Sequence, residues 1–189
     1  MLVELSPERH GVAFDIAYAR ADNVTGKPVY ARPAAWLVPE AEAALLGAAA
    51  LARAQGLGLL LFDAFRPLEA QWALWRAIPD PAYISDPRRG GIHTRGVAVD
   101  LTVTGPDGKA LDMGTGFDDL TPASHHGSGA VPPEAQRNRA LLLGLMSAAG
   151  WDFYMHEWWH YQLFRPRRYP PLTDREAGTA MMATSSEFP

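Results

Sequence analysis

The chain has 189 residues and no cysteine, and this absence limits both how it can be stabilised and what it can bind. Disulfides, thiolate nucleophiles, iron–sulfur clusters and cysteine-ligated zinc sites are excluded, so any bound metal must be held by histidine and carboxylate side chains. Hydrophobic residues make up 48% of the chain. At this length they can form the core of one domain, and we expect a single folded unit.

The charge balance is mildly acidic, with 17 basic and 21 acidic side chains. The chain has no long run of basic residues, so neither a nucleic acid nor an anionic membrane is expected as its partner. The N-terminus lacks the basic and apolar regions of a signal peptide, and no stretch of 18 uncharged apolar residues occurs. We therefore expect a cytoplasmic protein, or a periplasmic one if a signal peptide has been removed. The oligomeric state is left open.

Apolar residues at helical spacing, bounded by proline and glycine, predict helices, and short runs rich in aliphatic, β-branched or aromatic residues predict strands. The predicted helices span residues 39–56, 68–78 and 133–149. The predicted strands span residues 57–65 and 96–103, with one or two more in residues 151–164. Because helices and strands mix without a regular βαβ rhythm, we expect an α+β domain with a central, mainly antiparallel sheet flanked by helices.

The C-terminal segment TDREAGTAMMATSSEFP loses this apolar periodicity. Segments of this kind at chain ends are often poorly ordered. We expect the domain to span residues 1–172, and residues 173–189 to form a partly disordered tail.

The first candidate site is the segment HTRGVAVD, which runs from His93 to Asp100. It places a histidine before a small turn and an aspartate on the strand predicted to follow. Histidine and aspartate side chains can both bind zinc, and these two could reach the same ion. A catalytic zinc site, however, uses three protein ligands, so one more is needed. The simpler interpretation is a surface histidine and an aspartate that caps a turn or forms an ion pair.

The second candidate site is HEWWH, from His156 to His160, which matches H-E-x-x-H. On a helix, His156 and His160 would both bind zinc beside the general base Glu157, with Glu176 as a distant third ligand. The aromatic flanks and Pro166 argue against a helix here. The other interpretation uses only Glu157 and His160, close to a strand end, and leaves His156 without a role in metal binding.

These motifs resemble the VanX-type D-alanyl-D-alanine dipeptidases, a group within the zinc D,D-peptidase superfamily (peptidase family M15). GIHTRGVAVD is similar to the S-x-H-x-x-G-x-A-x-D motif of that family, and EWWH is similar to its second motif. Further similar stretches follow the family order: DNVTGKPVY from Asp22, DAFRP from Asp63, DMGTGFD from Asp112, and the triplet Ser124-His125-His126. Together the motifs extend over about residues 18 to 170.

The resemblance implies zinc-dependent hydrolysis of D-alanyl-D-alanine, or of a closely related small dipeptide, to free amino acids. The implied ligands of the single zinc ion are His93, Asp100 and His160. Glu157 would activate the zinc-bound water as general base and then act as general acid. Arg66 would lie over the scissile carbonyl, and Asp118 would hold the substrate ammonium. The implied fold is the α+β domain shared with D,D-carboxypeptidases and with the zinc domain of hedgehog signalling proteins.

Several alternatives stay open at this stage. The chain could be a D,D-carboxypeptidase that trims longer peptidoglycan peptides, or a non-hydrolytic zinc-binding module. Its biological purpose could be glycopeptide resistance or the recycling of cell-wall dipeptide. Gly91 stands where the family motif has serine, which puts substrate affinity in question. Asp63 is expected either to orient Arg66 or to cap the turn, and the pair Arg88-Arg89 to lie on a solvated loop.

Overall fold

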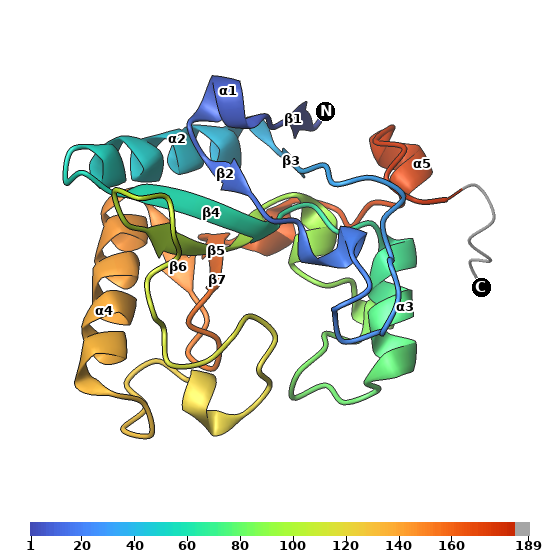
Figure 1. The fold of residues 1–189 in the computed structure, drawn as a ribbon. Coiled ribbons are helices and arrows are strands. Elements are labelled where there is room, and N and C mark those ends of the chain that lie inside the picture. The colour runs from blue at the N-terminus through green and yellow to red at the C-terminus, as the bar shows by residue number, and fades with distance from the viewer. Residues whose placement is uncertain (184–189) are drawn as a thin grey trace.

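Five strands form the central sheet of the computed structural model, which describes residues 1–183 (Figure 1). Their order across the sheet is β2-β4-β5-β7-β6, and every neighbouring pair is antiparallel except β2 with β4. The strands are β2 (Ala13–Phe14), β4 (Gly58–Asp63), β5 (Ala98–Thr104), β6 (Trp151–Phe153) and β7 (His160–Leu163). A separate ribbon pairs β1 (Val3–Glu4) with β3 (Trp36–Leu37). The expected α+β domain with a mainly antiparallel sheet is confirmed.

Two long helices pack together and against the sheet: α2 (Pro39–Arg53) and α4 (Pro133–Ala148). Both begin with proline, whose fixed backbone angle suits the first helical position. A third helix, α3 (Leu68–Ala77), lies at the right of Figure 1, on the opposite side of the molecule from α4. The remaining short helices are α1 (Pro7–His10) and α5 (Asp174–Ala177). No helix within residues 1–183 is long and apolar enough to span a membrane.

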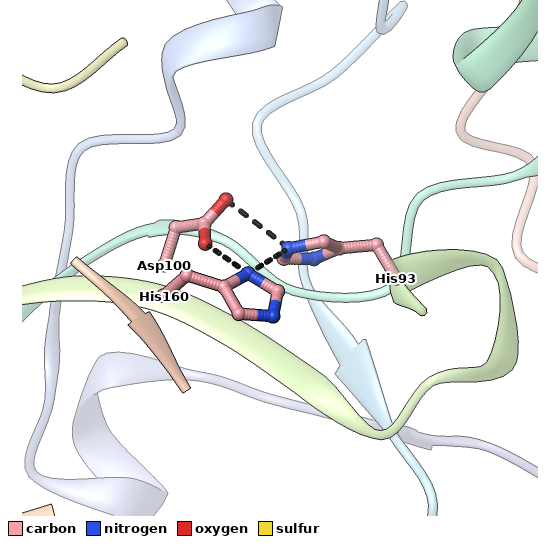
Figure 2. Close-up of side chains that lie close together, drawn as sticks. All are labelled: His93, Asp100 and His160. Atoms are coloured by element: carbon pink, nitrogen blue, oxygen red, sulfur yellow. Dashed lines mark hydrogen bonds and ion pairs between the residues drawn. The ribbon is translucent and has the colours of Figure 1, made fainter. Parts of the chain in front are cut away.

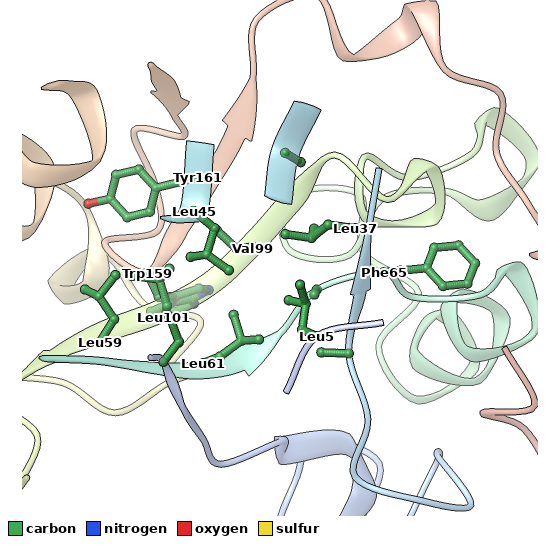
Figure 3. Close-up of a cluster of buried hydrophobic side chains, with 14 of the residues drawn as sticks. Leu5, Leu37, Leu45, Leu59, Leu61, Phe65, Val99, Leu101, Trp159 and Tyr161 are labelled. Carbon is green, nitrogen blue, oxygen red and sulfur yellow. The ribbon is translucent and has the colours of Figure 1, made fainter. Parts of the chain in front are cut away.

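Side chains alternate along β5 between the apolar core and the candidate site. Leu101 and Val103 are fully buried and pair in register with Leu61 and Leu59 of β4. They belong to one apolar cluster with Leu45 of α2 (Figure 3). Asp100 alternates with these residues and therefore points to the opposite face of the sheet.

A register shift in β4, between Leu61 and Asp63, changes the face on which the strand ends. Without it, Asp63 would share the apolar face of Leu61. The shift instead pairs Asp63 with Asp100, and Asp100 pairs with His160 in β7. Residues directly opposite each other on neighbouring strands point to the same face. The sheet therefore carries a row of three polar side chains across β4, β5 and β7.

The first part of the expected tail, residues 173–183, contains regular structure. Thr173 and Glu176 form a reciprocal capping box at the start of α5. The carboxylate of Asp174 accepts hydrogen bonds from the backbone N–H groups of Met181 (2.9 Å) and Met182 (3.1 Å), and the Met181 side chain is fully buried. These contacts attach residues 173–183 to the domain, whereas residues 184–189 of the expected tail lie outside the described residues.

Candidate metal centre and catalytic pocket

Three buried side chains bring possible metal-ligand atoms together at the end of the polar row (Figure 2). His93 Nε2 lies 3.0 Å from His160 Nδ1 and 3.2 Å from Asp100 Oδ2. His160 Nδ1 lies 3.1 Å from Asp100 Oδ1. The two motifs, whose histidines are 67 positions apart in the sequence, thus meet in space.

Local backbone structure explains how His93 reaches Asp100. His93 begins a single 3₁₀ turn, His93–Arg95, which ends at Gly96 with a φ of 66°. A side chain would strain this left-handed conformation, and a Cβ atom at Gly96 would lie 2.7 Å from Leu2 Cδ2. The glycine therefore permits the reversal that places His93 beside the strand carrying Asp100.

The hydrogen bonds of the two imidazoles leave their lone pairs facing each other. His93 Nδ1 lies 2.7 Å from the carbonyl oxygen of Ala64, which can only accept, so Nδ1 carries the proton. His160 Nε2 lies 3.2 Å from Gln162 Oε1, which in this orientation of the amide can accept a hydrogen bond from it. The remaining nitrogens and the Asp100 carboxylate then converge as three acceptors. Such a set is repulsive in itself and matches the ligands of a metal cation.

The carboxyl group of Asp100 is adapted to this position. The guanidinium of Arg66, whose Nη2 lies 3.4 Å from Asp100 Oδ2, is a fixed positive charge that favours the ionised carboxylate. Asp100 is therefore ionised at neutral pH and available as a ligand.

Glu157 lies in the turn that joins β6 to β7, three residues before His160. Its Oε2 atom is 3.9 Å from His160 Nδ1, and its side chain is 18% exposed. Burial raises the pKa of Glu157 to about 7, although the nearby His160 opposes the shift. A carboxyl group with a pKa near neutrality, close to a metal centre, can both accept and return a proton.

The helical interpretation of HEWWH is wrong. Residues 154–159 form turns, and His156 is exposed, with its ring stacked on His125 at a centroid distance of 4.5 Å. Glu176 is occupied in the capping box of α5. Neither His156 nor Glu176 belongs to the cluster of His93, Asp100 and His160. The aromatic residues of this segment favour extended structure, and this preference outweighs the helical spacing of the two histidines.

Arg66 is buried beside this cluster and held by several acceptors. Its Nε donates to Asp63 Oδ2 (2.8 Å), its Nη1 to Gln71 Oε1 (3.2 Å) and its Nη2 to Asp100 Oδ2 (3.4 Å). Asp63 in turn accepts from the Tyr30 hydroxyl at 2.8 Å. Of the two interpretations of Asp63, the structure supports orientation of Arg66, and the guanidinium is fixed next to Asp100.

Asp118 lies in a loop between β5 and α4 and, like Arg66, contacts Tyr18. It has a positive φ of 58°, an unusual conformation for a residue other than glycine. Its Oδ2 accepts from the Tyr18 hydroxyl at 2.9 Å, and the Tyr18 ring lies under the Arg66 guanidinium at 4.8 Å. Burial raises the pKa of Asp118 to about 7, against the opposing charge of Arg66. An ammonium group bound here would favour the ionised carboxylate.

Most of these polar groups line one cavity of about 200 Å³. Its walls come from segments far apart in sequence, including the loop of residues 79–92 and the turn before β7. The residues that carry chemistry in its lining are Tyr18, Arg66, Gln71, His93, Asp100, Asp118, Glu157 and His160. Sequence reasoning missed Tyr18 and Gln71, since neither belongs to the motifs that it used.

The position of Gly91 is explained by Gln71. A Cβ atom at Gly91 would lie 3.2 Å from Gln71 Oε1 and 3.6 Å from the Cβ of Ser85. Gln71 is buried, accepts from Arg66 and donates to the Ser85 carbonyl oxygen at 2.8 Å. The glutamine amide therefore fills the space that a side chain at position 91 would need, and it places a polar group beside Arg66.

The fold and the site together define a class of protein. The pocket of this α+β domain combines a His-Asp-His cluster, a carboxylate of raised pKa and a fixed guanidinium. These are the parts of a metallohydrolase. A family model described as peptidase M15, D-Ala-D-Ala dipeptidase, matches residues 1–171. The chain belongs to this family and is a metallopeptidase, which confirms the resemblance found in the sequence.

Individual relatives match over most of their length. A D-alanyl-D-alanine dipeptidase of Escherichia coli (strain K12) is 42% identical over 174 residues, which cover 92% of this chain and 90% of that protein. A D-alanyl-D-alanine dipeptidase of Enterococcus faecium is 36% identical, covering 85% of this chain and 90% of its own. One of Streptomyces coelicolor is 37% identical, covering 81% and 86% respectively.

Proposed function

We propose that this protein is a zinc-dependent dipeptidase that hydrolyses D-alanyl-D-alanine. The observation that carries the proposal is the convergence of possible ligand atoms from His93, Asp100 and His160 beside Glu157 and Arg66 in one cavity. The names of its relatives support the substrate. A cavity of about 200 Å³ also suits a small ligand, since pockets for drug-sized molecules measure about 300–1,000 Å³.

His93, Asp100 and His160 would hold the zinc ion. Two neutral imidazoles and one carboxylate fit its preference for nitrogen and oxygen ligands and leave the site with net positive charge. When bound, zinc supplies Lewis acidity and lowers the pKa of water toward about 7. His93 and His160 are held in the required tautomers by Ala64 and Gln162.

The chain's own side chains would divide the remaining work. Glu157 takes the proton of the attacking water on a carboxylate oxygen and returns it to the departing amine. Arg66 presents a fixed positive charge to the carbonyl oxygen as negative charge develops there. Asp118 binds the free ammonium of the dipeptide, with the Tyr18 hydroxyl orienting its carboxylate. Asp63 and Gln71 position Arg66.

The proposed function is tested by an activity panel with the zinc-loaded enzyme. The panel compares D-Ala-D-Ala, L-Ala-L-Ala and a pentapeptide that ends in D-Ala-D-Ala. We expect kcat/KM to be highest for D-Ala-D-Ala, by about tenfold or more, because shape selection in a small pocket gives differences of this order. A second cavity of about 200 Å³ lies next to the catalytic pocket and shares Glu157 and Trp159 with its lining. Faster cleavage of the pentapeptide would favour the carboxypeptidase alternative, and absence of all hydrolysis would favour a non-hydrolytic zinc module.

Arg66→Ala should lower kcat by about 10²- to 10³-fold, the usual effect of removing one oxyanion-stabilising donor. Arg66→Lys should recover part of the loss, since lysine keeps the charge but not the planar set of donors that Asp63 and Gln71 bind. Steady-state kinetics of the folded, zinc-loaded variants measure both effects. Arg139→Lys is the control, because Arg139 is also buried but bonds only groups outside the pocket, such as the Met113 carbonyl oxygen. A lowered melting temperature with unchanged kcat in Arg66→Ala would leave Arg66 a structural role only.

A further inference from the structure

Four arginine side chains surround a second, larger cavity beside the loop that walls the catalytic pocket. This cavity measures about 710 Å³ and is lined by Arg88, Arg89, Arg95 and Arg167. It shares Pro81, Ser85 and Ile92 with the lining of the catalytic pocket but none of the proposed catalytic or metal-binding residues. The arginines come from three separate 3₁₀ turns that the fold brings together.

The positive charge around this cavity is largely uncompensated. Arg88 has a carboxylate partner, Asp86, at 2.7 Å. For Arg89, Arg95 and Arg167, no carboxylate within residues 1–183 lies within 4.0 Å. Like charges gathered in this way repel one another, so an anion between them would be bound favourably.

Arg95 shows the imbalance most clearly. Its side chain is buried, with 9% of the residue exposed, yet its acceptors are the backbone carbonyl oxygens of Tyr169 and Arg89 rather than an acidic group. Its Nε atom is buried and has no hydrogen-bond partner within the described part of the chain. A buried cation without a counter-ion is costly, and a bound anion removes that cost.

We propose that this cavity is a binding site for a phosphate group, carried either by inorganic phosphate or by a phosphate monoester. Guanidinium groups match phosphate geometry with paired N–H donors, and three unpaired cations suit a doubly charged anion. The apolar side of the cavity, which includes Trp75, Pro79 and Ile92, leaves room for the organic part of a monoester. This site does not depend on the dipeptidase activity proposed above.

The test is isothermal titration calorimetry of the zinc-loaded, full-length protein with inorganic phosphate, glucose 6-phosphate and glucose. We expect saturable binding of at least one phosphate compound and none of glucose. In Arg89→Ala/Arg167→Ala, this binding should weaken at least about tenfold, because charge-assisted hydrogen bonds are lost. Arg168→Ala is the matched control, since Arg168 is equally exposed on the same turn but does not line the cavity.

The outcomes also distinguish this site from the proposed metal centre. Binding that is unchanged in the double variant, or that weakens equally in Arg168→Ala, would overturn the proposal. Equal affinity for the two phosphate compounds would identify free phosphate as sufficient, whereas tighter glucose 6-phosphate would identify a monoester. Arg89 and Arg167 are exposed, so the double variant should keep its melting temperature and its peptide hydrolysis. If it does not fold, Arg167→Glu serves in its place, with the same loss of binding expected.

Discussion

Glu157→Gln should keep the metal and lose kcat by about 10²- to 10⁴-fold, the range that general acid–base catalysis contributes. Glutamine has nearly the same shape but cannot take a proton from water. Glu157 is not part of the His93, Asp100 and His160 cluster, so metal content should not change. Steady-state kinetics and metal analysis of the same preparation measure the two quantities separately.

Glu176→Gln is the control for this variant. Glu176 is exposed in the capping box of α5 and outside the catalytic pocket, so its replacement should leave kcat unchanged. Near-normal turnover by metal-replete Glu157→Gln would refute the role of Glu157 as base. Loss of metal together with activity would instead make Glu157 a part of the ligand set.

His93→Ala should remove bound zinc and with it peptide hydrolysis. Replacing even the hydrogen-bond partners of metal ligands typically costs about 10- to 100-fold in affinity, so loss of a ligand should cost more than about 100-fold. Zinc affinity, measured by competition with a chelating dye, gives the effect directly. His160→Ala and Asp100→Asn should behave in the same way, because their ligand atoms meet that of His93.

His156→Ala is the matched control, since it removes an imidazole from the same turn region. His156 is exposed and stacks on His125, so its loss should leave zinc affinity unchanged. If His156→Ala loses zinc and His93→Ala keeps it, the assignment of ligands proposed above is incorrect. Loss of zinc in every variant would point to unfolding, which circular dichroism of each protein would reveal.

Regular elements of this fold were predictable where the sequence carries a period or a stop signal. Pro39 and Pro133 open α2 and α4, and α4 stops just before Gly150. The two-residue strands β1, β2 and β3 were missed, because two residues cannot display an alternation. The residues of the capping box, Thr173 and Glu176, are visible in the sequence, but the prediction of a disordered tail relied on the lack of apolar periodicity there.

The residues of the candidate site also differ in how far the sequence predicts them. The motifs left several ligand sets open, and the family resemblance carried by them implied the set of His93, Asp100 and His160. The contact of Gln71 with Arg66 depends on how α3 packs beside β4, and no local pattern reports such packing. The gathering of Arg95 with Arg167 likewise depends on tertiary structure, and the sequence suggested only a solvated loop near Arg88.

The register shift that places Asp63 opposite Asp100 builds part of the site into the central sheet, the kind of structure that resists local unfolding most strongly. Asp63, Asp100 and His160 are joined through backbone hydrogen bonds of adjacent strands, and such ladders commonly open only with global unfolding. Asp118 and residues 79–92, in contrast, belong to loops, which open at much lower free energy. A dipeptide could therefore enter and leave by local opening of the loops while the ligand cluster keeps its geometry.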